Sequence, residues 1–137
     1  MGQDSVTEFL KFDDKFAILL ALTSNQGAND FQIPNDLFLD VISKSQKWNN
    51  SQNLMYVVGA TKSDYLLKIR DIVKDNFLLI PGIGTQGGNL QQTIKNSTKH
   101  NKRILINVSR AIIYANNDFK YLDSAEKVAD DFNLKSF

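Results

Sequence analysis

Four short apolar runs recur along the chain, and each is four to seven residues long. They are rich in Ile, Leu, Val and aromatic residues. Apolar residues fill consecutive positions instead of alternating with polar ones, which is typical of parallel strands buried on both faces. We therefore predict buried strands at residues 16–22, 54–59, 77–80 and 104–108.

Segments with helical spacing lie between these runs. The segment 63–73 opens at Ser63, a residue type that often caps a helix, and its Leu and Ile residues recur on one face. Further helices are predicted at residues 5–11, 36–48, 89–98 and 124–132. The pattern thus predicts one helix followed by four strand–helix units, which is an α/β organisation.

The segments that follow the strands carry the candidate chemistry. After the third strand comes a loop at residues 81–88 with four glycines, which lets backbone N–H groups approach a ligand closely. The fourth strand leads into Asn107-Val108-Ser109-Arg110, where the Arg110 guanidinium offers a planar set of donors that matches a phosphate. Two successive strand ends that build one phosphate site are typical of the last two strands of a (β/α) barrel.

In such a barrel all the strand ends lie on one rim, so we expect Ser24, Gln86 and Arg110 to converge on a ligand. Each feature also has a purely structural interpretation. The glycines can form a tight turn, Ser24 can cap a turn, Gln86 can bond the loop backbone and Arg110 can pair with a carboxylate. Their shared position at strand ends favours binding.

The number of strands is too small for a closed fold. A (β/α) barrel closes with eight strands, and this chain offers four. The predicted fold class is α/β of the TIM (β/α)8-barrel family, with residues 1–137 as a single segment that covers about the last four strand–helix units. Two bare sheet edges, at residues 16–22 and 104–108, and an uncovered apolar interior then predict self-association as a homo-oligomer.

Composition narrows the classes of function. The 137 residues suit one domain, and 42% hydrophobic residues suffice for a core. A net charge of +1 does not indicate a nucleic-acid partner, and no apolar run is long enough to span a membrane.

The chain has no Cys, which fits a reducing cytoplasm, and we see no signal peptide at the N-terminus. His100 is the single histidine, which argues against a Ser-His-Asp triad or a histidine metal cluster.

Four motifs in order resemble the C-terminal half of orotidine 5′-phosphate decarboxylase, in its longer bacterial and protozoal type. The resemblance covers essentially the whole chain, from its opening residues Met1-Gly2-Gln3-Asp4-Ser5 onward. The motifs are Leu20-Ala21-Leu22-Thr23-Ser24-Asn25-Gln26-Gly27 with Asp30-Phe31-Gln32, Val57-Val58-Gly59-Ala60-Thr61, Pro81-Gly82-Ile83-Gly84-Thr85-Gln86-Gly87-Gly88, and Asn107-Val108-Ser109-Arg110-Ala111-Ile112-Ile113-Tyr114-Ala115.

The resemblance implies a role for each of several residues. Ser24 would bond the polar edge of the pyrimidine, and Gln86 would bridge the pyrimidine and the phosphate. The N–H groups of Ser109 and Arg110, with the Arg110 guanidinium, would hold the 5′-phosphate, and Ile83 would pack near the ring. The substrate-binding residues implied in this way are Ser24, Ile83, Gly84, Gln86, Ser109 and Arg110.

The catalytic residues of that family are expected outside this chain. The resemblance implies an array of alternating Lys and Asp residues, including Asp-x-Lys-x-x-Asp after the third strand, in the N-terminal half. Asp118, Lys120 and Asp123 match these letters, but they follow the last strand by several residues. We interpret them as a loop and a helix cap, so no catalytic residue is predicted in this chain.

The function implied is decarboxylation of orotidine 5′-phosphate to uridine 5′-phosphate in pyrimidine synthesis, a carboxy-lyase reaction without metal or organic cofactor. This chain would supply the binding half, be inactive alone, and need the missing N-terminal half as partner. Two alternatives stay open: a non-catalytic fragment that binds phosphate or a nucleotide, and another phosphate-binding barrel enzyme. Ser24 and Gln86 argue against the second, because they address a pyrimidine ring.

Overall fold

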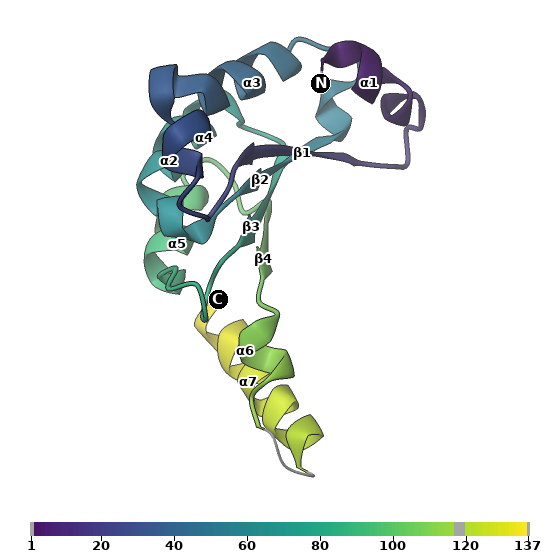
Figure 1. Cartoon of the computed structure of the whole chain (residues 1–137). Helices are drawn as coiled ribbons and strands as arrows, with labels where there is room; N and C mark the ends of the chain where they lie inside the picture. Colours follow the sequence, from purple (N-terminus) through teal and green to yellow (C-terminus); the bar gives the residue numbers. More distant parts are fainter. Residues whose placement is uncertain (1, 117–119, 137) are drawn as a thin grey trace.

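The computed structural model describes residues 2–116 and 120–136, and its strands form one parallel sheet in the order β1-β2-β3-β4 (Figure 1). The strands are β1 Ala17–Leu22, β2 Leu54–Val58, β3 Phe77–Pro81 and β4 Ile104–Asn107. The four predicted strands are confirmed within one residue at each end. A parallel α/β sheet of four strands is the arrangement expected of half a TIM barrel.

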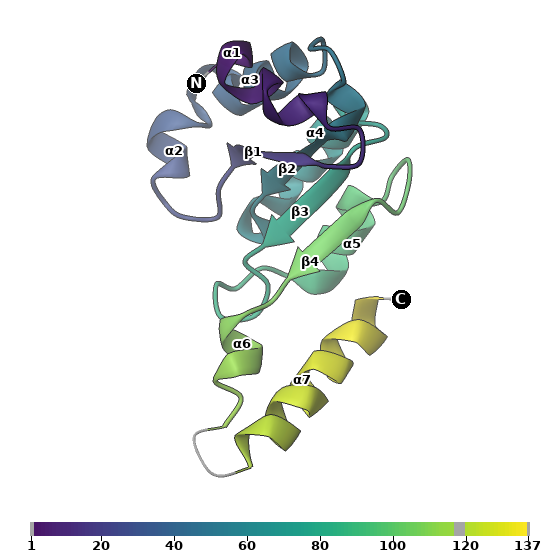
Figure 2. The same ribbon diagram turned by 90° about the vertical axis from the view of Figure 1, so that its right-hand side faces the viewer.

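Helices precede, connect and follow the strands. The α-helices are α1 Gln3–Thr7, α2 Ala28–Phe31, α3 Leu37–Ser45, α4 Leu66–Ile72, α5 Leu90–Ser97, α6 Arg110–Ile113 and α7 Tyr121–Ser136. The 3₁₀ turns are η1 Phe9–Lys11, η2 Pro34–Asp36, η3 Ser51–Asn53 and η4 Ala60–Tyr65. Helices α3, α4 and α5 lie on one face of the sheet, and α6 and α7 extend from the end of β4 (Figure 2).

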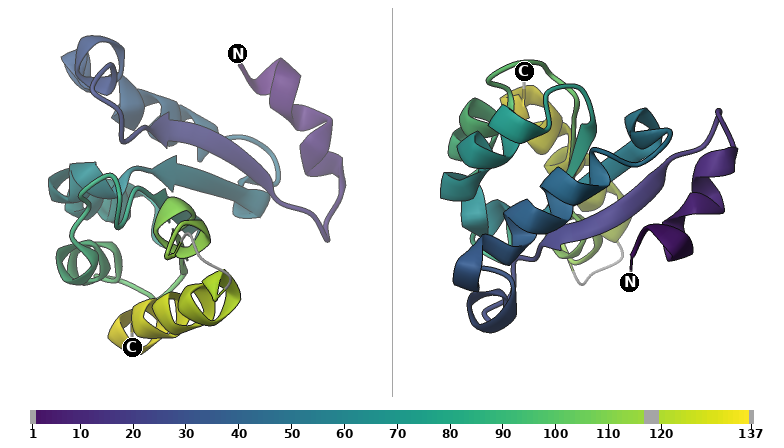
Figure 3. Two further views of the ribbon diagram at one scale, coloured as in Figure 1. Left: turned by 60° about the horizontal axis from the view of Figure 1, so that its bottom comes forward. Right: turned by 90° about the horizontal axis from the view of Figure 1, so that it is seen from above.

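The N-terminal segment lies apart from this helical layer. Figure 3 shows α1 on the opposite side of β1 from α3. The predicted helix over 5–11 is divided into α1 and η1, whose Val6 and Leu10 are buried. Asn50, just before β2, donates to the carbonyl oxygen of Leu10 at 2.9 Å and so ties this segment to the sheet.

The predicted start of the helix over residues 63–73 differs from the structure. Ser63 does not cap a helix, because it lies inside η4, and α4 begins only at Leu66. The Thr61 hydroxyl in η4 donates to the Ser24 carbonyl oxygen at 2.8 Å and so connects this turn to the segment after β1. By contrast, Asn89 does cap α5, because its Oδ1 accepts from the Gln92 N–H at 2.9 Å.

The C-terminal helix is longer than predicted at both ends. Helix α7 spans Tyr121–Ser136, whereas the sequence pattern indicated residues 124–132. Asp123 therefore lies within the first turn of the helix and not in a loop, and Lys120 is a turn residue just before it. Asp118, the first letter of the apparent catalytic motif, lies outside the described residues.

The core lies between the sheet and the helices α3 and α4. Phe38 and Ile42 of α3 and Ile69 of α4 are fully buried against strand residues such as Tyr56 and Leu78. Each side chain of this kind contributes about 1.5–3 kcal/mol when it leaves water. Alternate residues of β2 and β3 supply this packing, so the strands use one face for the core.

The prediction that all strands are buried on both faces is wrong for the two outer strands. Ile18 and Leu20 of β1 are 51% and 61% exposed, and Leu105 of β4 is 47% exposed. These side chains point away from the helical layer because successive strand residues alternate between faces. The uncovered apolar face predicted for a half barrel is thereby confirmed for β1 and β4.

Polar groups fix the opposite ends of the strands, where the chain enters the sheet. Arg70 of α4 is fully buried and donates to four backbone carbonyl oxygens at 2.5–3.2 Å. Its acceptors are Ser97, Val73, Asn76 and Arg103. One guanidinium thus joins α4, the end of α5 and the segments before β3 and β4.

Candidate functional site

The loop after β3 closes on itself. Gly82 has φ of +103°, a left-handed conformation that a residue with a Cβ rarely adopts. The Gly88 N–H donates to the Gly82 carbonyl oxygen at 3.0 Å, and the Gly87 N–H to Gly84 at 2.8 Å. These two N–H groups donate to carbonyl oxygens within the loop. The glycines therefore determine the fold of the loop as well as exposing its backbone.

A small hollow of about 60 Å³ lies between this loop and the end of β4. Its walls come from the loop on one side and from the start of α6 on the other. It is lined by Pro81, Gly82, Ile83, Thr85, Gln86, Asn107, Ser109 and Arg110. The structure therefore brings together four of the six predicted binding residues, although they lie up to 27 positions apart in the sequence.

Ser24 joins this site through Gln86. The Ser24 hydroxyl donates to Gln86 Oε1 at 2.5 Å, which bridges the ends of β1 and β3. The bond occupies the amide oxygen, and the nitrogen of the same amide carries two N–H donors. A Cβ added at Gly82 would lie 3.0 Å from Gln86 Oε1 and 3.3 Å from Ser24 Cβ, so Gly82 also makes room for this pair.

Ser24 is itself held by neighbours that the sequence analysis did not single out as site residues. Thr61 Oγ1 donates to the Ser24 carbonyl oxygen at 2.8 Å. Gln32 Oε1 accepts from the Thr23 N–H at 2.7 Å and from the Thr23 hydroxyl at 3.1 Å. A Cβ at Gly59 would lie 2.5 Å from the Ser24 backbone, so only glycine allows β2 to pass so close.

Gly84 lies behind the hollow and does not line it. A Cβ at this position would sit 3.1 Å from Ala111 Cβ of α6 and 3.6 Å from Phe132 Cζ of α7. The residue thus lets the loop pack against the two C-terminal helices. The structure thus gives Gly84 a packing position, and its contact with a ligand stays a prediction.

Ser109 and Arg110 form the start of α6. The Ser109 hydroxyl donates to Asn107 Oδ1 at 3.0 Å, and the Ser109 carbonyl oxygen accepts from the Ile112 and Ile113 N–H groups. The first N–H groups of a helix have no acceptor within that helix. In α6 the first N–H groups belong to the segment of Ser109 and Arg110, which lines the hollow.

Asn107 is the residue that sequence reasoning missed most clearly. It is the last residue of β4, its side chain is exposed, and it lines the hollow. Its position at the carboxyl end of a strand was the available signal.

Hydrogen-bond donors and one cation characterise this hollow. Arg110 carries the single formal charge among its eight lining residues, and Thr85, Gln86, Asn107 and Ser109 add polar side chains. Donors around a guanidinium suit an anion such as a phosphate. Among the described residues no group of three or more His, Cys, Asp or Glu comes together, and no helix is long and apolar enough to cross a bilayer.

Two bacterial proteins named orotidine 5′-phosphate decarboxylase are similar to the chain. The protein of Christiangramia forsetii is 51% identical over 134 residues, which cover 95% of this chain and 49% of that protein. The protein of Flavobacterium johnsoniae is 52% identical over 135 residues, which cover 96% of this chain and 48% of that protein. No protein-family profile matches the chain.

Solved structures of orotidine 5′-monophosphate decarboxylases are similar in fold to the chain. The OMP decarboxylase of Leishmania donovani has a TM-score of 0.79 at 29% identity and covers 100% of this chain and 54% of that protein. The orotidine 5′-monophosphate decarboxylase of Methanocaldococcus jannaschii, solved with the inhibitor BMP, has a TM-score of 0.73 at 24% identity and supports the fold alone.

The chain spans about half the length of the curated relatives it matches. Its four-stranded parallel sheet is correspondingly part of a TIM barrel. Sequence identity near 50% over nearly all of its residues and a similar fold in solved decarboxylases lead to one conclusion: the chain belongs to the orotidine 5′-phosphate decarboxylase family.

Proposed function

We propose that this chain is the C-terminal, substrate-binding half of an orotidine 5′-phosphate decarboxylase. The reaction is the loss of CO₂ from orotidine 5′-phosphate to give uridine 5′-phosphate in pyrimidine synthesis. The observation that carries the proposal is the meeting of Gln86 and Arg110 in one hollow rich in donors, with Ser24 bonded to Gln86.

Each residue has a role in this proposal that matches its chemistry. The Arg110 guanidinium and the N–H groups of Ser109 and Arg110 bind the 5′-phosphate, since charged planar donors form the strongest bonds to such an anion. Gln86 bridges the phosphate and the pyrimidine with its amide nitrogen, while its oxygen stays on the Ser24 hydroxyl. Ser24 addresses the polar edge of the pyrimidine, and Ile83 packs near the ring.

Gly84 acts indirectly in this scheme. It keeps the loop close to Ala111 and Phe132, so that Gln86 stays over the hollow.

Binding alone does not perform the chemical step. Contacts to a remote phosphate accelerate a reaction by organising the site, and they do not replace an acid and a charge array at the reacting carbon. Loss of members of a catalytic unit typically costs several orders of magnitude in rate. We therefore propose that the chain alone is inactive, and that a complementary half supplies the Lys and Asp residues.

The partners follow from the same proposal. Residues 1–137 act as one half-barrel segment that binds the substrate, the product and the complementary half, and that also associates with itself. The location we propose is the cytoplasm, which the absence of Cys supports. No metal or organic cofactor enters the scheme.

A complementation assay tests the proposal. CO₂ release from orotidine 5′-phosphate is measured with this chain alone, with the remaining half of the Flavobacterium johnsoniae relative alone, and with both together. We expect turnover only with both halves. Robust turnover by this chain alone would contradict the proposal, and so would its failure to support turnover although the two halves associate.

The main alternative is a fragment that binds phosphate or a nucleotide without a catalytic role. Calorimetric titration separates the two. Binding of uridine 5′-phosphate well above that of inorganic phosphate, together with rescue by the complementary half, supports the enzyme. Binding without rescue supports the fragment.

A further inference from the structure

The loop after β3 is supported by apolar side chains of the segments that follow β4. A Cβ added at Gly84 would lie 3.1 Å from Ala111 Cβ, 3.6 Å from Phe132 Cζ and 3.9 Å from Val108 Cγ1. Val108 follows β4 directly, Ala111 belongs to α6 and Phe132 to α7. These three side chains are here called the rear support, because Gly84 itself does not line the hollow that is proposed to bind phosphate.

The rear support acts next to both side chains that are proposed to bind the phosphate. Gly84 and Gln86 lie in one turn, which the Gly87 N–H closes by donating to the Gly84 carbonyl oxygen at 2.8 Å. Ala111 directly follows Arg110 at the start of α6. A shift of this turn relative to α6 therefore changes the separation of Gln86 and Arg110 across the hollow.

Phe132 is the one large side chain on the inner face of α7 among the residues described there. The other partly buried residues of the helix recur three or four positions apart, as expected for one helix face. They are Ser124, Ala125, Val128 and Ala129. Phe132 continues this face by one turn, packs against the buried core and reaches the loop. The sequence thus places a single aromatic ring where α7 meets the loop.

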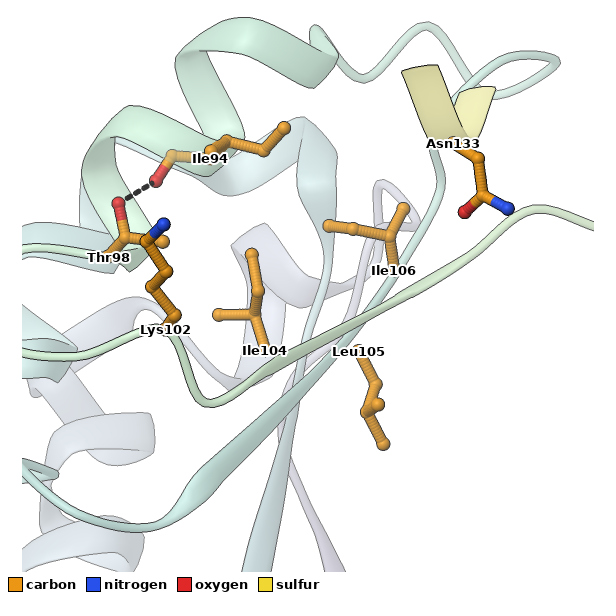
Figure 4. Close-up of a pocket in the computed structure, with 7 residues that line it drawn as sticks. All are labelled: Ile94, Thr98, Lys102, Ile104, Leu105, Ile106 and Asn133. Carbon is orange, nitrogen blue, oxygen red and sulfur yellow. Dashed lines mark hydrogen bonds between the residues drawn. The ribbon is translucent and has the colours of Figure 1, made fainter. Parts of the chain in front are cut away.

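Beside Phe132, helix α7 is not closely packed on the sheet. A hollow of about 420 Å³ lies between α5, β4 and α7. Figure 4 shows that Ile104 and Ile106 line it from β4 and that Asn133 lines it from α7. Asn133 directly follows Phe132 in the sequence. The ring therefore supplies a contact between α7 and the strand ends at a point where the neighbouring side chain faces open space.

We propose that Phe132 is a positioning residue for the phosphate group of the substrate. Its ring supports the loop at Gly84, so that Gln86 on the loop and Arg110 on α6 keep the separation that a bound phosphate needs. The inference rests on the proposed function, which assigns the phosphate to this hollow. Phe132 does not touch the ligand and acts only through the loop.

A purely structural role of Phe132 leads to a different expectation. Loss of packing on α7 then lowers the free energy of unfolding and weakens every ligand of the site to a similar extent. Loss of loop position weakens chiefly the ligands that carry a phosphate. The pyrimidine contact at Ser24 is held separately, because Thr61 donates to the Ser24 carbonyl oxygen at 2.8 Å. The ratio of the affinities for uridine 5′-phosphate and uridine therefore separates the two roles.

Calorimetric titration of two variants with uridine 5′-phosphate and with uridine tests the inference. Phe132→Ala removes the ring, and we expect the affinity for uridine 5′-phosphate to fall about 10-fold, the equivalent of one charged hydrogen bond. Phe132→Tyr keeps the ring but adds a hydroxyl at Cζ, the atom nearest to Gly84, so it should displace the loop with a similar loss. The affinity for uridine should change less than about twofold in both variants.

Val128→Ala is the matched control, because Val128 lies on the same face of α7 one turn earlier and is not among the side chains nearest to Gly84. It should leave the affinity ratio unchanged. Unchanged affinities in the Phe132 variants, equal losses for the two ligands, or the same change of ratio in Val128→Ala would each overturn the inference. A wild-type chain that binds uridine 5′-phosphate no better than uridine would instead overturn the proposed function.

Hydrogen exchange of the amides of residues 85–88 tests the support of the loop without any ligand. We expect faster exchange in Phe132→Ala than in the wild-type chain, because a loop that loses packing opens more often. Val128→Ala should leave this exchange unchanged. Equal exchange in Phe132→Ala and the wild-type chain would show that the ring does not hold the loop, and it would overturn the inference whatever the nucleotide titrations give.

Discussion

At the scale of single residues, the candidate site depends on a small set of polar contacts between strand ends. Ser24, Gln86 and Arg110 come from three different strand ends, and the hydrogen bond between Ser24 and Gln86 fixes the orientation of the Gln86 amide. A site built in this way has its donors in place before a ligand binds. Pre-organised donors bind more tightly because less ordering is needed on binding.

Arg110→Ala should weaken phosphate binding strongly. Hydrogen bonds to charged groups are worth about 1.5–3 kcal/mol each, so we expect the affinity for uridine 5′-phosphate to fall on the order of 10- to 100-fold. Calorimetric titration measures the change. Lys44→Ala is the control, because it removes an exposed positive charge on α3 without touching the hollow. Equal effects of the two variants would show that Arg110 acts only through net charge.

Gln32→Ala should loosen the segment that holds Ser24. The Thr23 N–H would lose its acceptor, which costs about 1 kcal/mol of unfolding free energy. Nucleotide affinity should also fall, because Ser24 would no longer be held in place. The conservative Gln32→Glu keeps an acceptor oxygen for both Thr23 donors and should restore affinity. Affinity that is lost in both variants would indicate a different role for Gln32.

At the scale of elements, buried polar groups determine how the helices and strands meet at the end opposite the candidate site. Arg70 connects α4 and α5 to the chain before β3 and β4. Burial lowers the pKa of Arg70 to about 10, and the nearby Asp75 acts in the opposite direction. The group therefore stays charged at neutral pH, and its donors are matched by backbone carbonyl oxygens.

Arg70→Met should destabilise the chain by about 3 kcal/mol, because it leaves several buried carbonyl oxygens without a donor. Urea unfolding followed by circular dichroism measures this loss. The control is Lys68→Met on the same helix, whose exposed side chain should change the unfolding free energy by about 0.5 kcal/mol or less. Similar losses in the two variants would contradict the role assigned to Arg70.

Tyr56 should make stability depend on alkaline pH. Burial raises the pKa of Tyr56 above its usual 10.0, and hydrogen bonds with Ser45 and Gln46 only partly oppose this. The phenol is neutral in both states below about pH 10. Above about pH 10 the Tyr56 phenol ionises first in the unfolded state. The unfolding free energy therefore falls as pH rises through the pKa of Tyr56 in the folded state.

Tyr56→Phe removes this ionisation and should flatten the pH dependence between about pH 9 and pH 11. It also removes hydroxyl bonds to Ser45 and Gln46, which costs about 1 kcal/mol at neutral pH. Unfolding in urea at a series of pH values measures both effects. An unchanged slope would mean that other groups cause the alkaline loss.

At the scale of the whole molecule, the chain is half of a closed architecture. Its helical face is packed, whereas the opposite face of its sheet keeps Ile18, Leu20 and Leu105 in water. Exposed apolar rows and unpaired strand edges are unfavourable for a lone domain. Association with a second half barrel, identical or complementary, removes both features.

Association should make the thermal unfolding midpoint depend on protein concentration, because a folded state that binds itself is stabilised by mass action. The midpoint of the wild-type chain should rise with concentration in calorimetry. Leu105→Lys should abolish this rise without lowering the midpoint at low concentration, since residue 105 is exposed in one copy. A midpoint that is independent of concentration for both proteins would contradict self-association.

The sequence by itself determined the local parts of this protein. Consecutive apolar residues predicted all four strands, and polar residues after the strands predicted Ser24, Gln86 and Arg110 as site candidates, because both signals are local in the chain. The family resemblance added Ile83, Gly84 and Ser109. The strand count also predicted half a barrel. Whether the six candidates bind a nucleotide stays a prediction that titration can test.

Only the tertiary structure decided which of these parts meet. It placed Asn107 in the hollow and Gly84 behind it, and it bonded Ser24 to Gln86 across 62 positions of sequence. It also exposed Ile18 and Leu105, which local pattern alone had predicted to be buried. The physical reason is that burial and contact depend on what covers a face, and the covering layer comes from distant segments or from another molecule.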